Sequence, residues 1–415
     1  MSPSADLGVV NARVVGAVPP SPRATALAIR AGRIVAVGAL ADVRGFFGVE
    51  TEVIDAGGAW AVPAFHDAHL HLLSYARMGA KLDCAGLRSL GELGGALGRR
   101  AATRPSGAWV RAVRYDETSW IDGRHPDRYD LDAAVPEHPV HLRHRALHLD
   151  VFNTAALRRL QLSDLPMGGL ERDPRTGAPT GRVYHAGDRL HQVLEHPTYD
   201  ELARSVRDAS ERLLAWGVTS VQDASITNGP AEWTLFHRLA ADGYLPLRVF
   251  FMPGVSSWRQ IPWADAPSAR VRQGPVKLMV EEGATDPSQL REAVASVRGA
   301  GRAVALHAVT EAEVTLAVDA LGDAGALPPA PPSRIEHGAV IPDQFLGTLR
   351  EAGVFVVGQP SLVYDRGDVY RAEFSPELYP WLHRAGSLVA AGVRYAASSD
   401  APVTEPIPGV GLAAA

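Results

Sequence analysis

Cysteine is almost absent from this chain of 415 residues, which contains a single one at position 84. One cysteine excludes an intramolecular disulfide framework and a zinc site built from several thiolates, and it fits a reducing cytoplasm. Cys84 stands before Ala-Gly, and we interpret it as a buried packing residue rather than a nucleophile.

Long apolar runs and blocks of basic residues are also absent. No uninterrupted apolar segment reaches the ~20 residues of a membrane-spanning helix, and the first residues lack the basic and apolar parts of a signal peptide. The net charge is -5 and the sequence contains no block of basic residues, so neither nucleic acid nor a membrane surface is an implied partner. We therefore expect a cytoplasmic protein with a small-molecule substrate.

The composition is that of an ordinary globular protein, with 46% hydrophobic and 21% charged residues. Residues 7–62 read as short alternating strands separated by turns, with Ala31, Gly32 and Arg33 as a tight turn. This pattern predicts a hairpin within a small, sandwich-like β module. We expect residues 1–62 to form this module as a non-catalytic cap, and residues 63–415 to form the main domain.

A regular alternation of helices and apolar strands begins near residue 200. Helices are predicted at residues 200–216, 231–242, 287–300, 311–321 and 343–352. Strands are predicted at residues 218–224, 247–252, 276–280, 303–308, 334–337, 354–359 and 393–400, after an opening strand in residues 63–72. Apolar strands that alternate with helices are typical of a parallel sheet covered by helices. Eight such strands predict an α/β fold, a (β/α)8 TIM-type barrel.

A segment at about 82–199 separates the first two predicted barrel strands, and we interpret it as an insertion. Its predicted elements are a helix at 89–102, strands at 109–115 and 139–144, a short helix from 154, and a Gly/Pro-rich loop at 167–181. Insertions at that end of a barrel usually shape the pocket. The residues here that could touch substrate, or could equally serve the structure, are Tyr115, Trp120, His148 and Asn153.

The opening strand carries a His-x-His pair. Side chains alternate faces on a strand, so Asp67, His69 and His71 all point the same way. Two convergent neutral imidazoles suit a divalent transition metal such as zinc, and Asp67 could serve as their hydrogen-bonding partner. A polar strand end without a ligand is the alternative interpretation.

Further polar residues stand at the ends of the later strands: Lys277, His307, His337 and Asp400. The carboxyl ends of barrel strands meet at one mouth, which is where the chemistry of this fold is found. Taken singly, each residue has an ordinary structural alternative. His307 or His337 could be a hydrogen-bonded core histidine, Lys277 could lie with its stem on the surface, and Asp400 could be a helix N-cap. Because six metal-competent residues fall at the ends of five strands, we interpret them as one site.

Six motifs carry a family resemblance that covers nearly the whole chain. They are residues 31–38, 63–71, 217–224, 334–338, 359–360 and 399–402. On these motifs the chain resembles the amidohydrolase superfamily, and more narrowly the N-substituted formamide deformylase-like members of amidohydrolase family 3. The His-x-His and Ser-Asp-Ala-Pro motifs are specific for the superfamily, but weak for any one substrate.

The resemblance implies a set of metal ligands. His69, His71 and Asp400 would hold one metal, His307 and His337 would hold a second, and Lys277, carboxylated on its amine, would bridge them. Without that modification a single-metal site is expected. The implied cofactor is one or two Zn²⁺ ions, with other divalent transition metals as alternatives. Competing oxygen ligands stand beyond the lysine, at Glu281 and Glu282.

The implied activity is hydrolysis of a C–N bond in an amide, an N-substituted formamide or a cyclic amide. A metal lowers the pKa of bound water towards ~7, so metal-activated hydroxide would attack the carbonyl carbon. Asp400 would act as general base and then as general acid toward the leaving nitrogen. The alternatives are a heterocycle deaminase with the same metal site, and a catalytically inactive barrel that serves as a binding or scaffold protein.

Two departures from the family pattern stand out. Ala64 and His66 replace the glycine and the small or aliphatic residue that are usual there, and we interpret His66 as packing or as support for the ligands. The sequence also stops soon after Asp400, whereas relatives continue through a last helix and strands that complete the β layer. We therefore expect a chain truncated at its C-terminus, whose exposed apolar surface predicts poor stability, a homo-oligomer, or a sequence that is part of a longer gene product.

Overall fold

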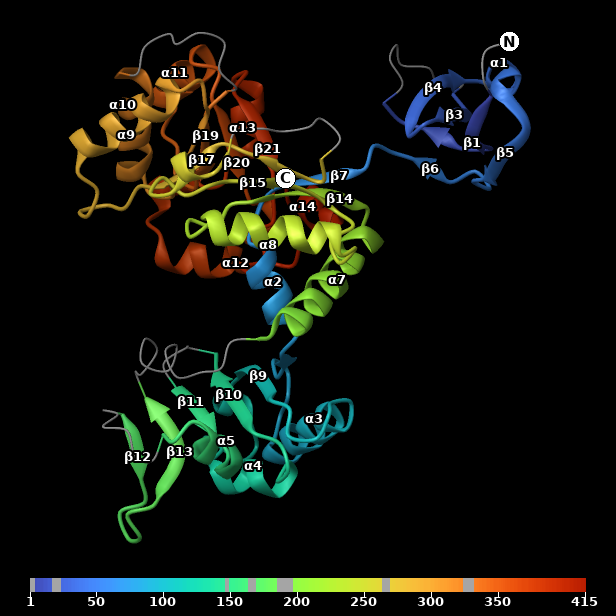
Figure 1. Cartoon of the computed structure of the whole chain (residues 1–415). Coiled ribbons are helices and arrows are strands. Elements are labelled where there is room, and N and C mark those ends of the chain that lie inside the picture. The colour runs from blue at the N-terminus through green and yellow to red at the C-terminus, as the bar shows by residue number, and fades with distance from the viewer. Residues whose placement is uncertain are drawn as a thin grey trace. The chain divides into compact units, whose positions relative to one another are not determined.

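The computed structural model describes residues 4–16, 24–145, 149–162, 169–184, 197–262, 269–323 and 332–415. Within these residues the chain forms two compact units. The first contains residues up to 66 together with 217–219, and the second contains residues 67–216 and 220–415 (Figure 1).

The first unit is built around a four-stranded sheet with the order β4-β3-β1-β5. The strands are β1 (Ala5–Val10), β3 (Ala26–Arg30), β4 (Arg33–Gly38) and β5 (Phe47–Asp55). A second pair joins β2 (Arg13–Val14) to β6 (Trp60–Ala61), and α1 (Leu40–Val43) and η1 (Arg44–Phe46) precede β5. Ala31 and Gly32 have φ angles of 49° and 71°, as a two-residue hairpin turn requires. The predicted hairpin is confirmed, whereas a sandwich-like module stays a prediction.

The second unit contains two sheets, with orders β16-β15-β14-β7 and β17-β18-β19-β20-β21. The first comprises β7 (Phe65–Leu70), β14 (Val218–Asp223), β15 (Arg248–Phe251) and β16 (Val271–Gln273), and the first two residues of β7 and of β14 belong to the first unit. The second comprises β17 (Val276–Met279), β18 (Val304–Ala308), β19 (Arg334–His337), β20 (Phe355–Gly358) and β21 (Arg394–Ala397). Every strand pair with a described register here is parallel, as the apolar runs predict.

Backbone hydrogen bonds also join these two sheets. The N–H of Lys277 donates to the carbonyl of Pro253 at 2.8 Å, beside the end of β15. Beyond β21, the N–H of Asp400 donates to the carbonyl of His69, and the N–H of His71 donates to the carbonyl of Ala401, each at 2.8 Å. The carboxyl end of β7 therefore meets the segment that follows β21, the last strand of the second unit. With its parallel strands and intervening helices, the unit has an α/β fold.

Helices lie between the parallel strands in the sequence or follow them. They are α2 (Leu72–Gly79), α7 (Tyr199–Ala215), α8 (Pro230–Ala241), α9 (Pro287–Gly299), α10 (Glu311–Asp323), α11 (Leu346–Glu351), α12 (Pro360–Glu373), α13 (Ala385–Ala390) and α14 (Pro408–Ala414). The predicted helix at 343–352 begins with a 3-10 turn, η4 (Asp343–Phe345), and the sequence reading missed α12. No helix of the described residues is both long enough and apolar enough to span a bilayer.

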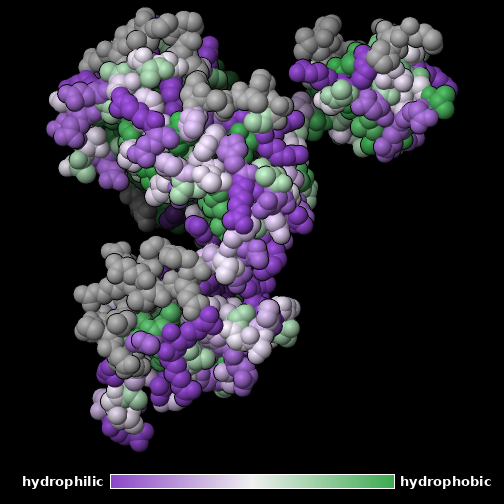
Figure 2. Space-filling view, in the orientation of Figure 1, coloured by the Kyte–Doolittle hydropathy of each residue, from purple (hydrophilic) through white to green (hydrophobic). Residues whose placement is uncertain are grey.

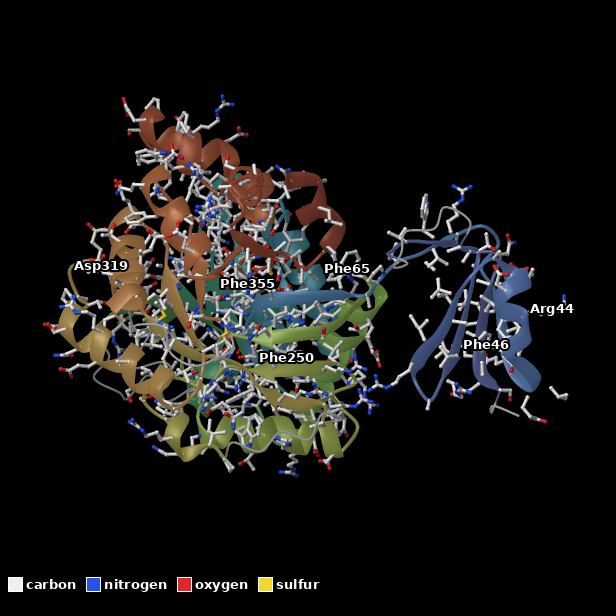
Figure 3. All side chains as sticks on the ribbon, turned by 90° about the horizontal axis from the view of Figure 1, so that it is seen from above. Arg44, Phe46, Phe65, Phe250, Asp319 and Phe355 are labelled. Carbon is white, nitrogen blue, oxygen red and sulfur yellow. The ribbon has the colours of Figure 1, made fainter. Side chains whose placement is uncertain are left out.

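The core of this unit lies between strands and helices. Figure 3 shows Phe250 on β15 and Phe355 on β20 among the strands, and Asp319 on α10 at the periphery. Within the described residues, one large set of packed apolar side chains draws most of its members from β17 to β20 and from the helices α9 to α11. On the face that Figure 2 shows, hydrophilic residues cover most of the described surface, and hydrophobic ones form only small patches.

The chain between α2 and α7 forms a separate six-stranded sheet, with the order β12-β13-β11-β10-β9-β8. Its strands are β8 (Leu82–Asp83), β9 (Val110–Tyr115), β10 (Val140–His144), β11 (Leu149–Phe152), β12 (Leu170–Arg172) and β13 (Pro179–Tyr184), and its helices are α3 (Leu90–Ala102), α4 (Arg128–Ala134) and α5 (Thr154–Arg159). The flanking strands in the sequence, β7 and β14, are neighbours in one sheet. This arrangement agrees with an insertion.

The predicted loop at 167–181 is confirmed at residues 173–178 but wrong at 170–172 and 179–181, where β12 and the start of β13 lie. The glycines that suggested a loop serve strand packing instead. A Cβ at Gly169 would lie 2.0 Å from the carbonyl oxygen of Tyr184, and one at Gly181 would lie 2.3 Å from that of Phe152. Only glycine allows such a close approach of two backbones.

Cys84 is predicted to be unreactive in the folded protein. It is 1% exposed, and burial raises the pKa of its thiol to about 12. Because the thiolate is the reactive form, alkylation at pH 8 should be on the order of a thousandfold slower in the native protein than in guanidinium chloride. Mass spectrometry after timed labelling measures both rates. Complete labelling of the native protein within minutes would contradict this burial.

Candidate metal centre

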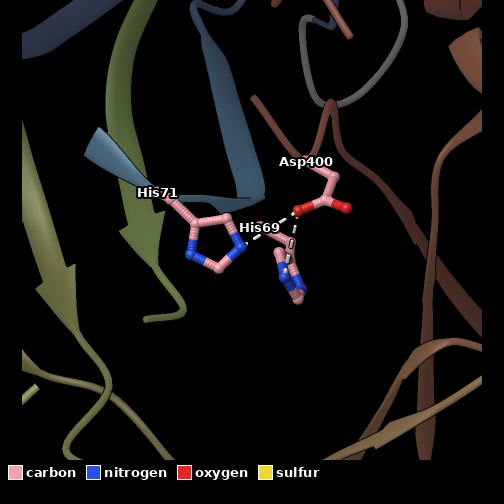
Figure 4. Close-up of side chains that lie close together, drawn as sticks. All are labelled: His69, His71 and Asp400. Atoms are coloured by element: carbon pink, nitrogen blue, oxygen red, sulfur yellow. Dashed lines mark ion pairs between the residues drawn. The ribbon is translucent and has the colours of Figure 1, made fainter. Parts of the chain in front are cut away.

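Three metal-competent side chains converge where β7 meets the segment after β21. His71 Nε2 lies 3.2 Å and His69 Nε2 lies 3.6 Å from Asp400 Oδ1, as Figure 4 shows. Each of the three offers a ligand atom within 4.8 Å of the others. The structure thus brings His69 and His71 together with Asp400, the grouping that the family resemblance implies for one metal.

The Asp400 carboxylate suits a cation. Its Oδ1 atom is buried and makes no hydrogen bond of acceptable geometry within the described residues, although two imidazole nitrogens lie close to it. A buried carboxylate oxygen without a hydrogen bond is costly, and a cation would remove that cost. Asp400 also has a φ of 56°, a left-handed conformation that non-glycine residues rarely adopt and that is often found at functional sites.

The other predicted ligands lie next to this cluster. The ring of His337 is 4.8 Å from that of His69 and 4.5 Å from that of His307, measured between centroids. His337 Nδ1 lies 2.9 Å from Gln359 Oε1, so an Nδ1–H would donate there and leave Nε2 as the lone-pair atom. Lys277 on β17 is 2% exposed. This buried position agrees with the predicted role of Lys277 at the metal centre but does not test it. The roles of the histidines as metal ligands likewise stay predictions.

Burial disfavours the charged forms of these groups. It lowers the pKa of His69 to about 3, helped by the charge of Lys277, and the pKa of His307 to about 4, helped by His337. Burial likewise lowers the pKa of Lys277 to about 8. A neutral imidazole presents a lone pair, which is the form that binds metal.

A buried ion network that the sequence reading missed supports His69. The carboxylate of Glu336 contacts His69 Nδ1, and Arg334 donates to both of its oxygens, at 2.5 and 2.8 Å. Arg334 also donates to the carbonyl of Ala68 at 2.6 Å and to the side chain of Gln222. Burial raises the pKa of Glu336, but Arg334 and His69 outweigh it and hold the pKa well below its usual range.

This network fixes the direction of the His69 ring. A carboxylate at Nδ1 orients the imidazole and leaves Nε2 for a metal, as is usual for metal-binding histidines. The signal in the sequence was a pair of charged residues, Arg334 and Glu336, on the same face of a short strand whose residues are all buried.

The residues predicted to support the ligands or to touch substrate have different surroundings in the structure. Asp67 accepts a hydrogen bond from Ser399 Oγ at 2.6 Å and one from the backbone N–H of His69 at 3.2 Å, so it braces the backbone rather than an imidazole. Glu281 is exposed and lies outside the cavity lining. His66 is exposed, so the prediction that it is a packing residue is wrong.

In the insertion, Tyr115 and Trp120 are buried in the apolar core, and Asn153 caps α5. His148 lies outside the described residues. Contact of any of these with substrate stays a prediction.

A cavity of about 970 Å³ lies beside the cluster. His307, His337, Gln359 and Asp400 line it, so four polar side chains of the centre face one space. The larger part of the lining is apolar and comes from Val309, Leu316, Ala339, Val340, Leu362, Phe374, Leu378 and Leu382. Glu282, which also lines the cavity, accepts a hydrogen bond from Thr310 Oγ1 at 3.2 Å rather than approaching the histidines as a competing ligand.

Residues 52–415 match the model of the amidohydrolase family. The chain belongs to this family. It is 27% identical to N-substituted formamide deformylase of Arthrobacter pascens, over 97% of this chain and 82% of that protein. Among solved structures, it resembles uncharacterized metal-dependent hydrolases from Pyrococcus furiosus and Pyrococcus horikoshii OT3. The respective TM-scores are 0.77 and 0.78, each at 22% identity, over 98% and 99% of this chain and 88% and 85% of those chains.

The Glu336 network gives a testable prediction for this amidohydrolase family member. Glu336→Gln removes the charge that orients His69 and neutralises Arg334. We expect metal affinity to fall about 10–100-fold, and the free energy of unfolding to fall by about 3–5 kcal/mol because a buried charge loses its partner. Competition with a chelating dye and denaturant titration measure the two effects.

The matched control is Glu351→Gln, which alters a carboxylate that is 76% exposed and is paired with Arg350 on the surface. It should change both quantities little, since exposed ion pairs contribute little to stability. Metal binding by Glu336→Gln as tight as that of the unmodified protein would show that Glu336 does not orient a ligand.

Proposed function

We propose that this chain is a metal-dependent hydrolase that cleaves the C–N bond of a small amide, with N-substituted formamides as the first class to test. The observation that carries the proposal is the convergence of His69, His71 and Asp400 on one point beside the cavity. Membership of the amidohydrolase family and similarity to a protein named N-substituted formamide deformylase support the reaction class.

The donor set fits a divalent transition metal, zinc first. Two neutral imidazoles and a carboxylate are a usual ligand set for catalytic zinc and leave a position open. When bound, such an ion polarises a carbonyl and lowers the pKa of water near neutrality. His307 and His337 would hold a second ion, with Lys277 as a bridge if its amine is carboxylated to give an anionic oxygen ligand.

The protein's own groups would handle the proton and the substrate. Asp400 has a carboxylate at the cavity wall, where it can take a proton from the attacking water and return it to the leaving nitrogen. Gln359 holds His337 by its Nδ1 atom, which fixes that ring at the cavity wall. Glu336 holds the ring of His69 by the equivalent atom, Nδ1.

The cavity supports a small substrate with an apolar substituent. Its volume of about 970 Å³ lies at the upper end of small-molecule sites, which span roughly 300–1,000 Å³. Apolar side chains from α12 and the segment after it, Leu362, Phe374, Leu378 and Leu382, would bury the part of the amide that does not react.

We propose that the eight parallel strands β7, β14, β15, β17, β18, β19, β20 and β21 make one (β/α)8 barrel, with β16 beside β15. The backbone hydrogen bonds of Lys277 with Pro253 and of Asp400 with His69 support this closure. The centre would then lie at the carboxyl ends of the strands, where barrel enzymes carry their chemistry.

Asp400→Asn tests the proton role. This variant should retain its metal but lose about 10²–10⁴-fold in kcat, since the amide cannot transfer the proton. Metal content comes from elemental analysis. Turnover comes from amine release with a panel of N-alkyl and N-aryl formamides, carboxamides and cyclic amides. Full activity in Asp400→Asn would remove the residue from proton transfer.

Chelation tests the class of the protein. Dialysis against a chelator should abolish hydrolysis and Zn²⁺ should restore it, because ligands this convergent should retain the ion in normal purification. Fewer than ~0.5 equivalents of metal after gentle purification would instead favour a metal-free binding protein. Release of ammonia from heterocyclic amines, with no amide cleaved, would favour the deaminase alternative.

The bridging role of Lys277 can be read out directly, because the sequence has two lysines, Lys81 and Lys277. Metal-loaded protein equilibrated with ¹³C-bicarbonate should show a carbamate signal in its ¹³C spectrum. That signal should disappear in Lys277→Arg and persist in the matched control Lys81→Arg. A spectrum without it, in protein that binds two metals, would contradict the modification.

A further inference from the structure

The insertion contains a second group of metal-competent side chains, in addition to the centre described above. Glu117 lies on the short helix η2 (Glu117–Ser119), His125 lies in the loop that follows, and His144 is the last residue of β10. A ligand atom of each lies within 4.8 Å of those of the other two.

The contacts in this group focus on one carboxylate oxygen. Glu117 Oε2 lies 3.1 Å from His125 Nδ1 and 3.0 Å from His144 Nε2. Zinc–ligand bonds of about 2.0–2.1 Å place the atoms around a tetrahedral ion roughly 3.3 Å apart. Small adjustments of the side chains would therefore create room for an ion between the three.

The topology of the sheet explains why these residues meet. β9 and β10 are parallel, and His144 pairs with Tyr115 at their carboxyl ends, after a shift of register between Arg143 and His144. Ligands of open α/β sheets bind beyond the carboxyl ends of the strands, and such irregularities often aim side chains at a site.

The loop that carries His125 is anchored in place. Arg182 on β13 donates to the backbone carbonyls of His125 and Pro126, at 2.7 and 2.9 Å. The hydroxyl of Tyr115 lies 3.2 Å from His125 Nδ1. The rings of His125 and His144 are 5.5 Å apart and nearly perpendicular. His144 is thus positioned by the sheet, and an arginine holds the backbone of the loop that carries His125.

An ordinary ion pair explains the group less well. Glu117 Oε2 is buried and makes no hydrogen bond of acceptable geometry within the described residues. A buried carboxylate oxygen without a hydrogen bond is unfavourable, and a metal ion would satisfy it.

We propose that Glu117, His125 and His144 bind a divalent transition metal, with zinc as the ion that best suits two imidazoles and a carboxylate. The ion joins η2 and its loop to the end of β10. It thereby stabilises the carboxyl end of the sheet in the insertion. This site does not depend on the proposed hydrolase activity.

Cobalt titration of the full chain tests this site. The variant His69→Ala/His71→Ala/His307→Ala/His337→Ala removes the four histidine ligands proposed for the other centre, and it should still bind one Co²⁺ with the visible absorption of a low-coordinate ion. Adding His125→Gln should remove that absorption, whereas adding the matched control His138→Gln should not. His138 lies in the same insertion, where its ring contacts the carbonyl of Ala108. Absence of this Co²⁺ spectrum, or its persistence in His125→Gln, would overturn the proposal.

A second measurement avoids dependence on the folding of His125→Gln. Hydrogen exchange of His69→Ala/His71→Ala, with and without Zn²⁺, reports on the backbone of each segment. Binding should slow exchange in peptides that cover residues 115–126 and 140–145. Unchanged exchange in both peptides at saturating Zn²⁺ would equally overturn the site.

Discussion

The backbone pairing between the end of β7 and the segment after β21 is the constraint on which the candidate centre depends. Asp400 donates to the carbonyl of His69, and His71 donates to the carbonyl of Ala401. Ser399 is bound to Asp67 in the same place, by its backbone and by its hydroxyl. Residues that are far apart in the sequence of the second unit are thereby held with their ligand atoms close together. This is the pre-organisation that a metal site needs.

A costly buried charge network lies directly beside this pairing. Isolated buried charges are strongly unfavourable, and even paired ones seldom improve stability over apolar packing. The Arg334–Glu336 pair therefore has a clearer physical role in orienting His69 than in stabilising the fold. The positive φ angles of His337 and Asp400, 71° and 56°, likewise fall at the centre, where strain is commonly stored for function.

The strands and helices after residue 200 could be predicted because their signal is local: apolar runs alternate with capped amphipathic segments. The convergence of His69, His71 and Asp400 followed from strand ends meeting in a parallel sheet. Other features depend on tertiary contacts that no local pattern contains. Glycines at 169 and 181 looked like loop signals because their close backbone partners are distant in sequence. Glu336 was missed because only the fold brings it to His69, and Asp67 braces a backbone because Ser399 lies opposite.

The measurement that tests the central claim most directly is anomalous X-ray scattering at the zinc absorption edge, from crystals of protein purified without chelators. The account predicts a peak within bonding distance of His69 Nε2, His71 Nε2 and an oxygen of Asp400. If the crystals contain zinc but no peak lies among these three side chains, or if no metal is present at all, the proposed centre is contradicted.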